Sequence, residues 1–328
     1  MPAITDIPGI LVGHAHDSEA LTGCTVLLLP AGTVGGVDVR GGAPGTHETD
    51  LLSPLATVSE VHALALCGGS AFGLAAVTGV MGWLHAQGRG YNVGVARVPI
   101  VPAAVIFDLA LGRADRWPDA AMGYAACQAA TTELNEGCVG AGIGASVGKL
   151  LGMAQAMKSG IGSWSATLGD GTTVGALVVV NAFGDVRDAQ GQIIAGLRDL
   201  AQGGFADTGA VLRQGGLRPA IGTLAQTDPR QLSNTTLAVI ATDAALSKTE
   251  TNKLAQMAQD GLARAIRPVH TPFDGDTVFA LATGQRSGAH LVALGSLAAD
   301  VLAQAVVRAV QAATSMGGLP AIGDLAGR

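Results

Sequence analysis

The chain has 328 residues, 48% of them hydrophobic, which is enough apolar material for a sizeable core. The formal net charge is −6 and the 19 lysines and arginines are scattered singly, so we expect neither nucleic acid nor acidic lipid surfaces as partners. No continuous apolar stretch approaches the roughly 20 residues of a membrane helix, and no basic segment followed by an apolar run opens the chain. We therefore expect a cytoplasmic protein.

The four cysteines form no C-x-x-C pair and have no histidine at metal-ligand spacing, so no disulfide framework or zinc site is predicted. We expect each thiol to behave as a small buried hydrophobe. The glycine-rich stretch "GAGIGASVGK" departs from a P-loop at Ile143 and Leu150, which favours close backbone packing over phosphate binding. The sequence thus predicts neither a cofactor nor a metal.

In the first half, "CTVLLLPAGTVGGVDVR" (24–40) predicts two strands joined as a hairpin, followed by the loop "GGAPG". Residues 70–88 have helical spacing, with Ser70 as the N-cap and Gly88 as the stop. A second hairpin is predicted within 139–184, and its turn contains the Asp-Gly pair that favours tight hairpins.

In the second half, residues 185–234 are more polar and end in "AQTDPRQLSN", which is typical of an exposed linker. The stretch "TLAVIATDA" then predicts a strand, and "SKTE" (247–250) predicts a capping box for a helix that ends before Pro268. A loop and strand over 270–284 and a long last helix follow. Strands and helices are mixed, with both hairpins and crossovers.

The stretch "SNTTLAVIATDA" (233–244) places two hydroxyls where the linker meets a strand. A hydroxyl can attack the carbonyl before it when the backbone is bent, which converts the peptide bond into an ester. Hydrolysis between Asn234 and Thr235 would leave a threonine N-terminus, whose α-amine has a reference pKa of about 7.7–8.0 and can act as base for its own hydroxyl. Alternatively, Thr235 and Thr236 only begin a strand, which threonine favours.

Further polar residues stand in apolar surroundings. Asn181 ends the run "VGALVVV" and either offers an N–H to a developing oxyanion or forms a turn. Lys158 either polarises an oxygen or is an ordinary surface lysine. Asp274 and Asp276, in "DGD", either orient an ammonium or form a solvated turn or weak metal loop. The turn "CGGSAFG" (67–73) holds a second nucleophile candidate, although a serine cap on a glycine turn is the plainer interpretation.

Four stretches in combination, "RGGAPGTHETDLL", "CGGSAFGLAA", "NTTLAVIATDA" and "DGLARAIRPVHTPFDGDTVFALATG", resemble the DmpA-like family of self-cleaving amide hydrolases. The resemblance spans about residues 4–322 and is strongest to the endo-type hydrolases of 6-aminohexanoate (nylon) oligomers. It implies an α+β fold, a layered αββα sandwich in a single domain (1–328). It also implies self-cleavage into chains 1–234 and 235–328, and a homo-oligomer of such αβ units, commonly four.

The resemblance also implies roles for the polar residues. Thr235 would attack an amide carbonyl, and Asn181 would stabilise the oxyanion. Lys158 would hold the oxygen of the nucleophile, while Asp274 and Asp276 would anchor Lys158 and the ammonium of Thr235. The expected partner is a small or oligomeric amide substrate.

Phe107 lies where we expect some relatives to carry a tyrosine near the substrate. Three other functions stay open at this point. The first is an aminopeptidase, β-peptidyl aminopeptidase or D-esterase on the same fold. The second is acyl transfer of the ornithine acetyltransferase type, which shares a comparable threonine before a "TDA" strand. The third is a non-catalytic ligand-binding protein, which would remain one intact chain.

Overall fold

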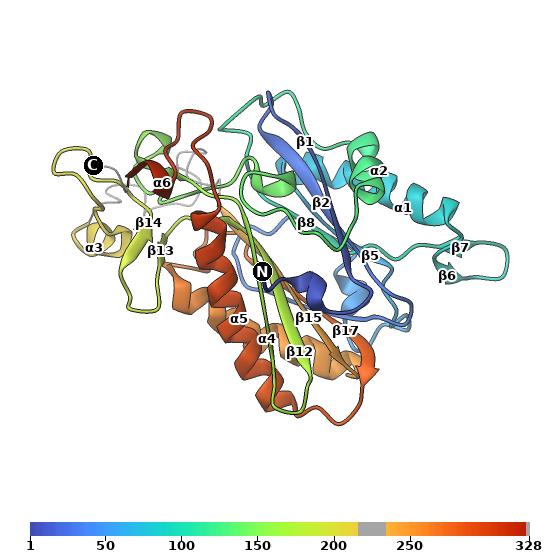
Figure 1. Cartoon of the computed structure of the whole chain (residues 1–328). Helices are drawn as coiled ribbons and strands as arrows, with labels where there is room; N and C mark the ends of the chain where they lie inside the picture. The colour runs from blue at the N-terminus through green and yellow to red at the C-terminus, as the bar shows by residue number, and fades with distance from the viewer. Residues whose placement is uncertain (216–233, 326–328) are drawn as a thin grey trace.

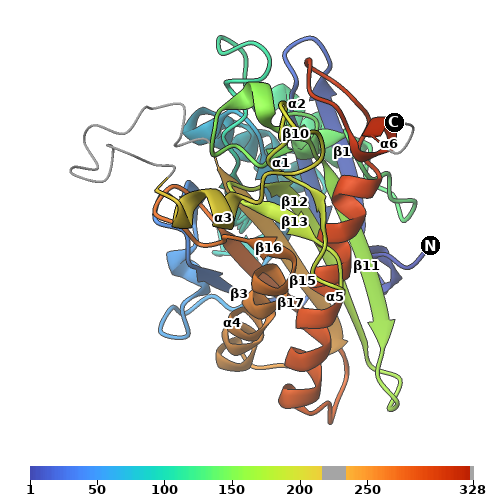
Figure 2. The same ribbon diagram turned by 90° about the vertical axis from the view of Figure 1, so that its left-hand side faces the viewer.

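The computed structural model describes residues 1–215 and 234–325. Two five-stranded sheets lie face to face, one with the order β1-β2-β5-β8-β4 and the other with the order β11-β12-β15-β17-β3 (Figure 1). Turning the molecule shows α4 and α5 on the outer side of the second sheet (Figure 2). The predicted linker "AQTDPRQLSN" lies, up to its serine, outside the described residues.

The first sheet consists of β1 (Leu11–Asp17), β2 (Thr22–Leu28), β5 (Ala63–Cys67), β8 (Ala103–Val105) and β4 (Thr46–His47). The second consists of β11 (Ile161–Thr167), β12 (Thr173–Asn181), β15 (Thr235–Ala244), β17 (Thr277–Arg286) and β3 (Val34–Val39). The longer helices are α1 (Ala76–Ala86), α2 (Ala120–Gln128), α4 (Lys248–Ala265) and α5 (Leu291–Gln311).

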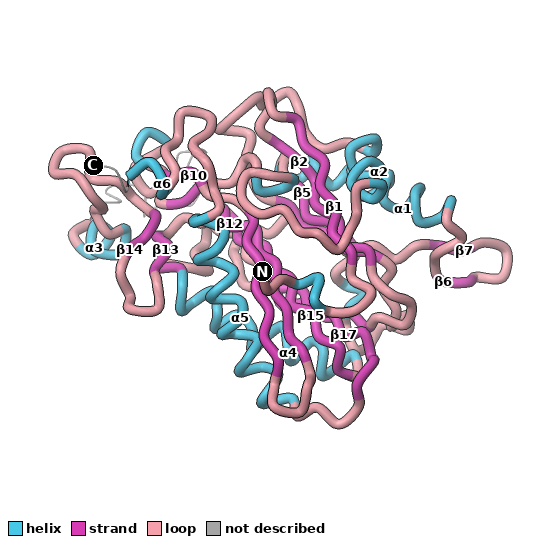
Figure 3. Tube along the Cα trace, in the orientation of Figure 1, coloured by secondary structure: helices cyan, strands magenta, loops and turns pink. Residues whose placement is uncertain are grey.

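The shorter elements are β6 (Tyr91–Asn92), β7 (Arg97–Val98), β9 (Ser146–Val147), β10 (Met157–Lys158), β13 (Asp185–Arg187), β14 (Ile193–Ala195), β16 (Ile266–Arg267), α3 (Thr208–Arg213) and α6 (Ile322–Leu325). Five 3₁₀ turns complete the described chain: η1 (Ile4–Asp6), η2 (Asp50–Leu52), η3 (Ser70–Ala75), η4 (Gly140–Gly142) and η5 (Met153–Gln155). The β6–β7 ribbon projects from one end of the molecule (Figure 3).

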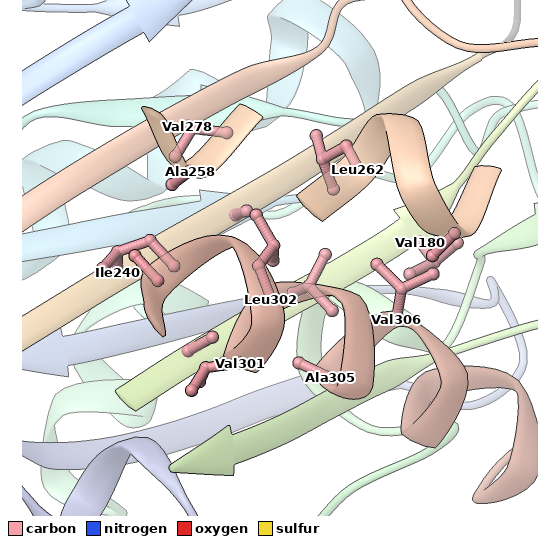
Figure 4. Close-up of a cluster of buried hydrophobic side chains, with 14 of the residues drawn as sticks. Val180, Ile240, Ala258, Leu262, Val278, Val301, Leu302, Ala305 and Val306 are labelled. Carbon is pink, nitrogen blue, oxygen red and sulfur yellow. The ribbon is translucent and has the colours of Figure 1, made fainter. Parts of the chain in front are cut away.

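Three buried hydrophobic clusters hold the layers together. One lies between the two sheets and includes Leu66, Leu237 and Phe279. A second joins the first sheet to α1 and α2. The third joins the second sheet to α4 and α5, where Leu262 and Leu302 pack over the strands (Figure 4). The order of layers is helix, sheet, sheet, helix, which confirms the predicted αββα sandwich.

Helix α5 is 21 residues long and has a mean hydropathy of 1.6, so by length and composition alone it would be able to cross a membrane. In the fold it covers β11 and β12 and packs along α4. Its leucines, valines and alanines supply much of the helix-side cluster, which accounts for its apolar composition.

The predicted hairpin at 24–40 is wrong. Its two strands exist, but β2 pairs with β1 and β5 in the first sheet, whereas β3 pairs with β17 in the second. The turn after Pro30 therefore carries the chain from one sheet to the other. A local turn signal cannot distinguish this connection from a hairpin, because the partner of β3 lies more than two hundred residues away.

Other predicted elements are confirmed. β11 and β12 form the second hairpin, with Thr167 opposite Thr173. The Ser247 and Glu250 side chains form the expected capping box of α4. The helix predicted from residue 70 begins as the 3₁₀ turn η3, and Gly69, with φ of 80°, occupies the cap position that was expected for Ser70. A left-handed glycine leads the chain out of β5, so a serine cap is not formed there.

The close approach of α5 to β11 gives a stability prediction. A Cβ atom on Gly162 would lie 2.2 Å from the carbonyl oxygen of Ala305, so Gly162→Ala forces the helix away from the strand. We expect this overpacking to lower the free energy of unfolding by about 1–3 kcal/mol. The control is Gly169→Ala in the turn of the same hairpin, where no atom lies within 4 Å of the added carbon. Equal urea midpoints for the two variants would contradict this packing.

Candidate active site

Strand β15 lies between β12 and β17, and its first residue is Thr235. In the antiparallel register with β12, Thr235 is directly opposite Asn181. Further along β15, Leu237 contributes to the cluster between the sheets, and Ala238 to the cluster under the helices. Because side chains alternate along a strand, Thr235 faces the space between the sheets and Thr236 faces the helices. The two hydroxyls are therefore on opposite faces of the sheet.

Two donors converge on the carbonyl oxygen of Asn234. The Thr235 hydroxyl donates a short hydrogen bond to it, and the backbone N–H of Gly275 donates another at 3.0 Å. A Cβ atom on residue 275 would lie 2.8 Å from Thr235 Oγ1, so this turn needs a glycine. The hydroxyl thus lies beside a carbonyl that is already polarised by an amide.

The loop "GGAPG" holds the Asp-Gly-Asp turn in place. The N–H of Ala43 donates to the carbonyl of Asp274 at 2.8 Å, and the N–H of Arg40 donates to the carbonyl of Asp276 at 3.0 Å. A Cβ atom on Gly41 would lie 2.3 Å from the carbonyl oxygen of Asp274, which is closer than atoms can approach. Glycine in this loop therefore permits the backbone contact that fixes the turn.

The carboxylates of the turn are buried, each 1% exposed. Asp274 accepts hydrogen bonds from the N–H and hydroxyl of Thr271 at 2.8 and 2.5 Å. Burial, reinforced by the charge of Asp276, raises the pKa of Asp274 to about 6. Asp276 accepts the N–H of Thr236 at 2.6 Å. The turn therefore binds the strand next to Thr235 as well as the carbonyl before it.

A lysine reaches Asn181, and it is Lys149. Its ammonium donates to Oδ1 of Asn181 at 2.7 Å and to the carbonyl of the same residue at 3.0 Å. The N–H of Ser146 also donates to Oδ1, at 3.1 Å, while Nδ2 of Asn181 donates to the carbonyl of Phe107 at 3.0 Å. At position 107 the backbone carbonyl therefore contacts the site.

The charge on Lys149 is finely balanced. Burial lowers its pKa to about 7, and the charges of Asp274, Asp108 and Asp276 oppose that shift. A lysine with this pKa changes its protonation state near neutral pH, whereas an exposed lysine stays protonated there. Lys149 thus has the properties expected of a lysine in an active site.

Lys158 lies elsewhere. Its ammonium is fully buried and donates to three backbone carbonyls, those of Ser159, Ala145 and Gly142, at 2.6, 2.9 and 3.2 Å. Burial lowers its pKa to about 8. The expected anchoring of Lys158 by Asp274 and Asp276 is therefore wrong, because this lysine instead satisfies carbonyls of the glycine-rich loop and of its own neighbour.

Lys149 stands in the stretch "SVGKLL", which the sequence singles out only as a departure from a phosphate-binding loop. The position of Lys149 is defined by the close packing of the preceding residue, Gly148, against another segment. A Cβ atom on Gly148 would lie 2.1 Å from the backbone of Gly196. No local spacing in the sequence distinguishes Lys149 from Lys158.

A small recess adjoins Lys149. Its lining includes Phe107, Asp108 and Ser146. Asp108 is 4% exposed and accepts the hydroxyl of Thr22 at 2.7 Å and the N–H of Gly69 at 2.6 Å. Burial raises its pKa to about 6. The recess therefore places a carboxylate beside the site lysine.

The second nucleophile candidate has no support. Cys67 is fully buried, and its thiol contacts that of Cys24 at 3.4 Å across the sheet. This contact, together with burial, raises the pKa of Cys24 and so disfavours its thiolate form. Within residues 1–215 and 234–325, no group of three histidine, cysteine or carboxylate side chains is placed to hold a metal ion.

Known proteins are similar to this chain in both sequence and fold. The model of peptidase family S58 matches residues 2–321. An uncharacterized aminopeptidase of Mycobacterium leprae is 46% identical, over 98% of this chain and 93% of its own length. A 6-aminohexanoate-oligomer endohydrolase of Kocuria sp. is 35% identical, over 93% of this chain and 85% of its own length.

Solved structures agree. A β-aminopeptidase of Burkholderia sp. superimposes with a TM-score of 0.68 at 25% identity, covering 99% of this chain and 92% of that protein. The L-aminopeptidase D-Ala-esterase/amidase of Ochrobactrum anthropi, described as a variant of the Ntn hydrolase fold, has a TM-score of 0.71 at 22% identity, covering 97% and 88%. These matches confirm the resemblance stated from the sequence. The chain therefore belongs to peptidase family S58 and is a hydrolase of amide bonds.

Proposed function

We propose that the chain cleaves itself between Asn234 and Thr235 and then hydrolyses linear amides, such as 6-aminohexanoate oligomers, with Thr235 as its N-terminal nucleophile. The observation that carries this proposal is the convergence of the Thr235 hydroxyl and the Gly275 N–H on one carbonyl oxygen. The hydroxyl supplies the attacking atom, and the amide supplies a donor for the oxyanion that the attack creates.

Self-cleavage would proceed through an ester intermediate. Thr235 Oγ1 bonds to the carbonyl carbon of Asn234 and loses its proton to a base, giving an oxyanion that faces the N–H of Gly275. The carbon–nitrogen bond then breaks and the nitrogen takes up a proton, leaving an ester. Water hydrolyses this ester to a carboxylate on Asn234 and a free hydroxyl on Thr235, whose α-amine was already released when the carbon–nitrogen bond broke.

Self-cleavage needs a base other than the α-amine, because that nitrogen is still an amide. Lys149 suits this role, since its pKa of about 7 leaves much of it neutral at physiological pH. It contacts Asn181, the residue opposite Thr235 in the sheet. After cleavage, the α-amine of Thr235 takes over as base for attack on an external amide, and an acyl-enzyme forms and is hydrolysed.

The first test is the cleavage itself. Freshly folded protein should give two fragments on a denaturing gel, the smaller beginning Thr-Thr-Leu-Ala on N-terminal sequencing. Thr235→Ala removes the attacking oxygen and should give a single uncut band, whereas Thr236→Ala, whose side chain faces the helices, should still be cut. An intact wild-type chain that hydrolyses amides would end the proposal.

A second test concerns the lysine. In precursor made by cell-free synthesis, the cleavage rate should rise about tenfold per pH unit up to about 7 and then level off, because only the neutral form of Lys149 accepts a proton. Lys149→Arg keeps the positive charge but cannot lose it, so cleavage should slow on the order of a hundredfold or more.

The matched control is Lys158→Arg, the same change at the other buried lysine. We expect it to lower the midpoint of unfolding while leaving the shape of the pH profile intact. The assignment would be contradicted if the cleavage rate of wild type did not rise up to pH 7. It would also be contradicted if that rise were lost in the Lys158 variant alone.

A specific observation favours a second candidate function, that of an aminopeptidase. The carboxylate of Asp108 lines the recess beside Lys149, where it would attract the free ammonium of a substrate. The 46% identical relatives also carry the name aminopeptidase.

Substrates with and without a free amine separate the two candidates. An endo-acting hydrolase of linear amides should cleave N-acetylated and free 6-aminohexanoate oligomers at comparable kcat/KM. An aminopeptidase should lose at least about tenfold in kcat/KM on acetylation. Asp108→Asn should remove that difference if Asp108 binds the amine, and a preference that survives the substitution would contradict its role.

A further inference from the structure

The two residues that precede the Asp-Gly-Asp turn by a few positions bind its carboxylates in the same way. The backbone N–H and hydroxyl of Thr271 both donate to Oδ2 of Asp274. The backbone N–H of His270 donates to Oδ2 of Asp276 at 3.0 Å, and Nδ1 of its ring contacts the same oxygen at 2.9 Å. The other oxygen of Asp276 is thereby directed at the N–H of Thr236, at 2.6 Å.

The backbone of His270 is adapted to this contact. Its φ is +56°, in the left-handed region that residues other than glycine seldom occupy. In this conformation its N–H and its ring nitrogen point at one oxygen. The Asp276 side chain is 1% exposed and that of His270 is 17% exposed, so the pair is largely shielded from water.

The ring acts as a hydrogen-bond donor. Both oxygens of Asp276 accept backbone N–H groups, which fits Nδ1 as the donor that faces Oδ2. Nε2 is buried and has no hydrogen-bond partner among the described residues. A hydrogen on Nε2 would therefore be left unsatisfied, which favours the tautomer with its hydrogen on Nδ1.

The contact reaches the nucleophile only through the backbone. Asp276 is bound to the N–H of Thr236, and that N–H belongs to the peptide unit immediately after Thr235. The Thr235 side chain lies on the opposite face of the sheet, toward Asn181. The contacts of His270 with Asp276 therefore influence the scissile carbonyl and the attacking hydroxyl only by fixing the strand.

From this chain of contacts we propose that His270 is a positioning residue. By orienting Asp276 it fixes the first peptide unit of β15, and so holds Thr235 Oγ1 at attacking distance from the Asn234 carbonyl and later from an external amide. The inference rests on the proposed function of Thr235.

Two substitutions separate hydrogen bonding from backbone strain. His270→Gly accepts a left-handed backbone but has no side-chain donor, whereas His270→Asn also tolerates that conformation and places an amide N–H near the position of Nδ1. We expect the glycine variant to slow both self-cleavage and kcat by about tenfold to a hundredfold, with KM within about twofold of wild type, because a displaced nucleophile loses rate rather than binding. The asparagine variant should recover most of that loss.

A double substitution tests the route of the effect. In an Asp276→Ala background, His270→Gly should cost less than about twofold further, because the partner through which it acts is gone. Independent, multiplying losses would overturn the proposal. The proposal would also be overturned if the glycine and asparagine variants had equal rates of self-cleavage and equal kcat at matched unfolding midpoints.

Hydrogen exchange supplies a readout that does not depend on catalysis. In uncut Thr235→Ala protein, the Thr236 N–H should exchange at least about tenfold faster with His270→Gly than with His270→Asn, because its carboxylate acceptor is released. Equal exchange would overturn the positioning role. If wild-type protein proves uncut, the proposed function fails, while the exchange result still decides whether His270 holds the strand.

Discussion

The pairing of β15 with a strand on each side determines where Thr235, Asn181 and the Asp-Gly-Asp turn lie relative to one another. Antiparallel pairing with β12 places Asn181 opposite Thr235, and parallel pairing with β17 brings the Asp-Gly-Asp turn alongside Asn234. These residues are far apart in the sequence, so the register alone assembles them. A slip of one residue would turn the Thr235 hydroxyl toward the helices and Thr236 toward the site. The bonds from Gly275 and Asp276 to consecutive peptide units of β15 oppose such a slip.

Burial of several charges at one place has a chemical consequence. Taking Lys149 and its neighbouring carboxylates out of water is costly, and their mutual attraction offsets only part of that cost. Burial therefore lowers the pKa of the lysine to about 7 and raises the pKa of Asp274 and Asp108 to about 6 each. The pKa values of these three groups therefore lie close to one another and to neutral pH. Burial also lowers the pKa of Lys158, to about 8, but its ammonium is held by backbone carbonyls rather than by Asn181.

Local signals predicted the parts of the fold that short segments determine. Turn and cap chemistry is confined to a few neighbouring residues. The sequence therefore predicts the capping box at Ser247, the hairpin of β11 and β12 and the start of β15. The αββα layers and the importance of Thr235 came from family resemblance. The sequence does not predict which of Lys149 and Lys158 contacts Asn181, since this depends on how two glycine-rich segments pack. The strand pairing of β3 failed for the same reason, because its partner β17 is distant in the chain.

On the proposed function, the site before cleavage differs from the site after it in charge and in occupancy. In the precursor, the carbonyl of Asn234 fills the position beside the Gly275 N–H, so no external amide can occupy it. Cleavage leaves a carboxylate on Asn234 and an ammonium on Thr235, which adds no net charge to a buried region. An external carbonyl can reach that donor only after the new carboxylate has moved away. Displacement of the new chain end would therefore be a step of activation separate from the cut itself, and the same Gly275 N–H would serve first the self-cleavage and then the substrate.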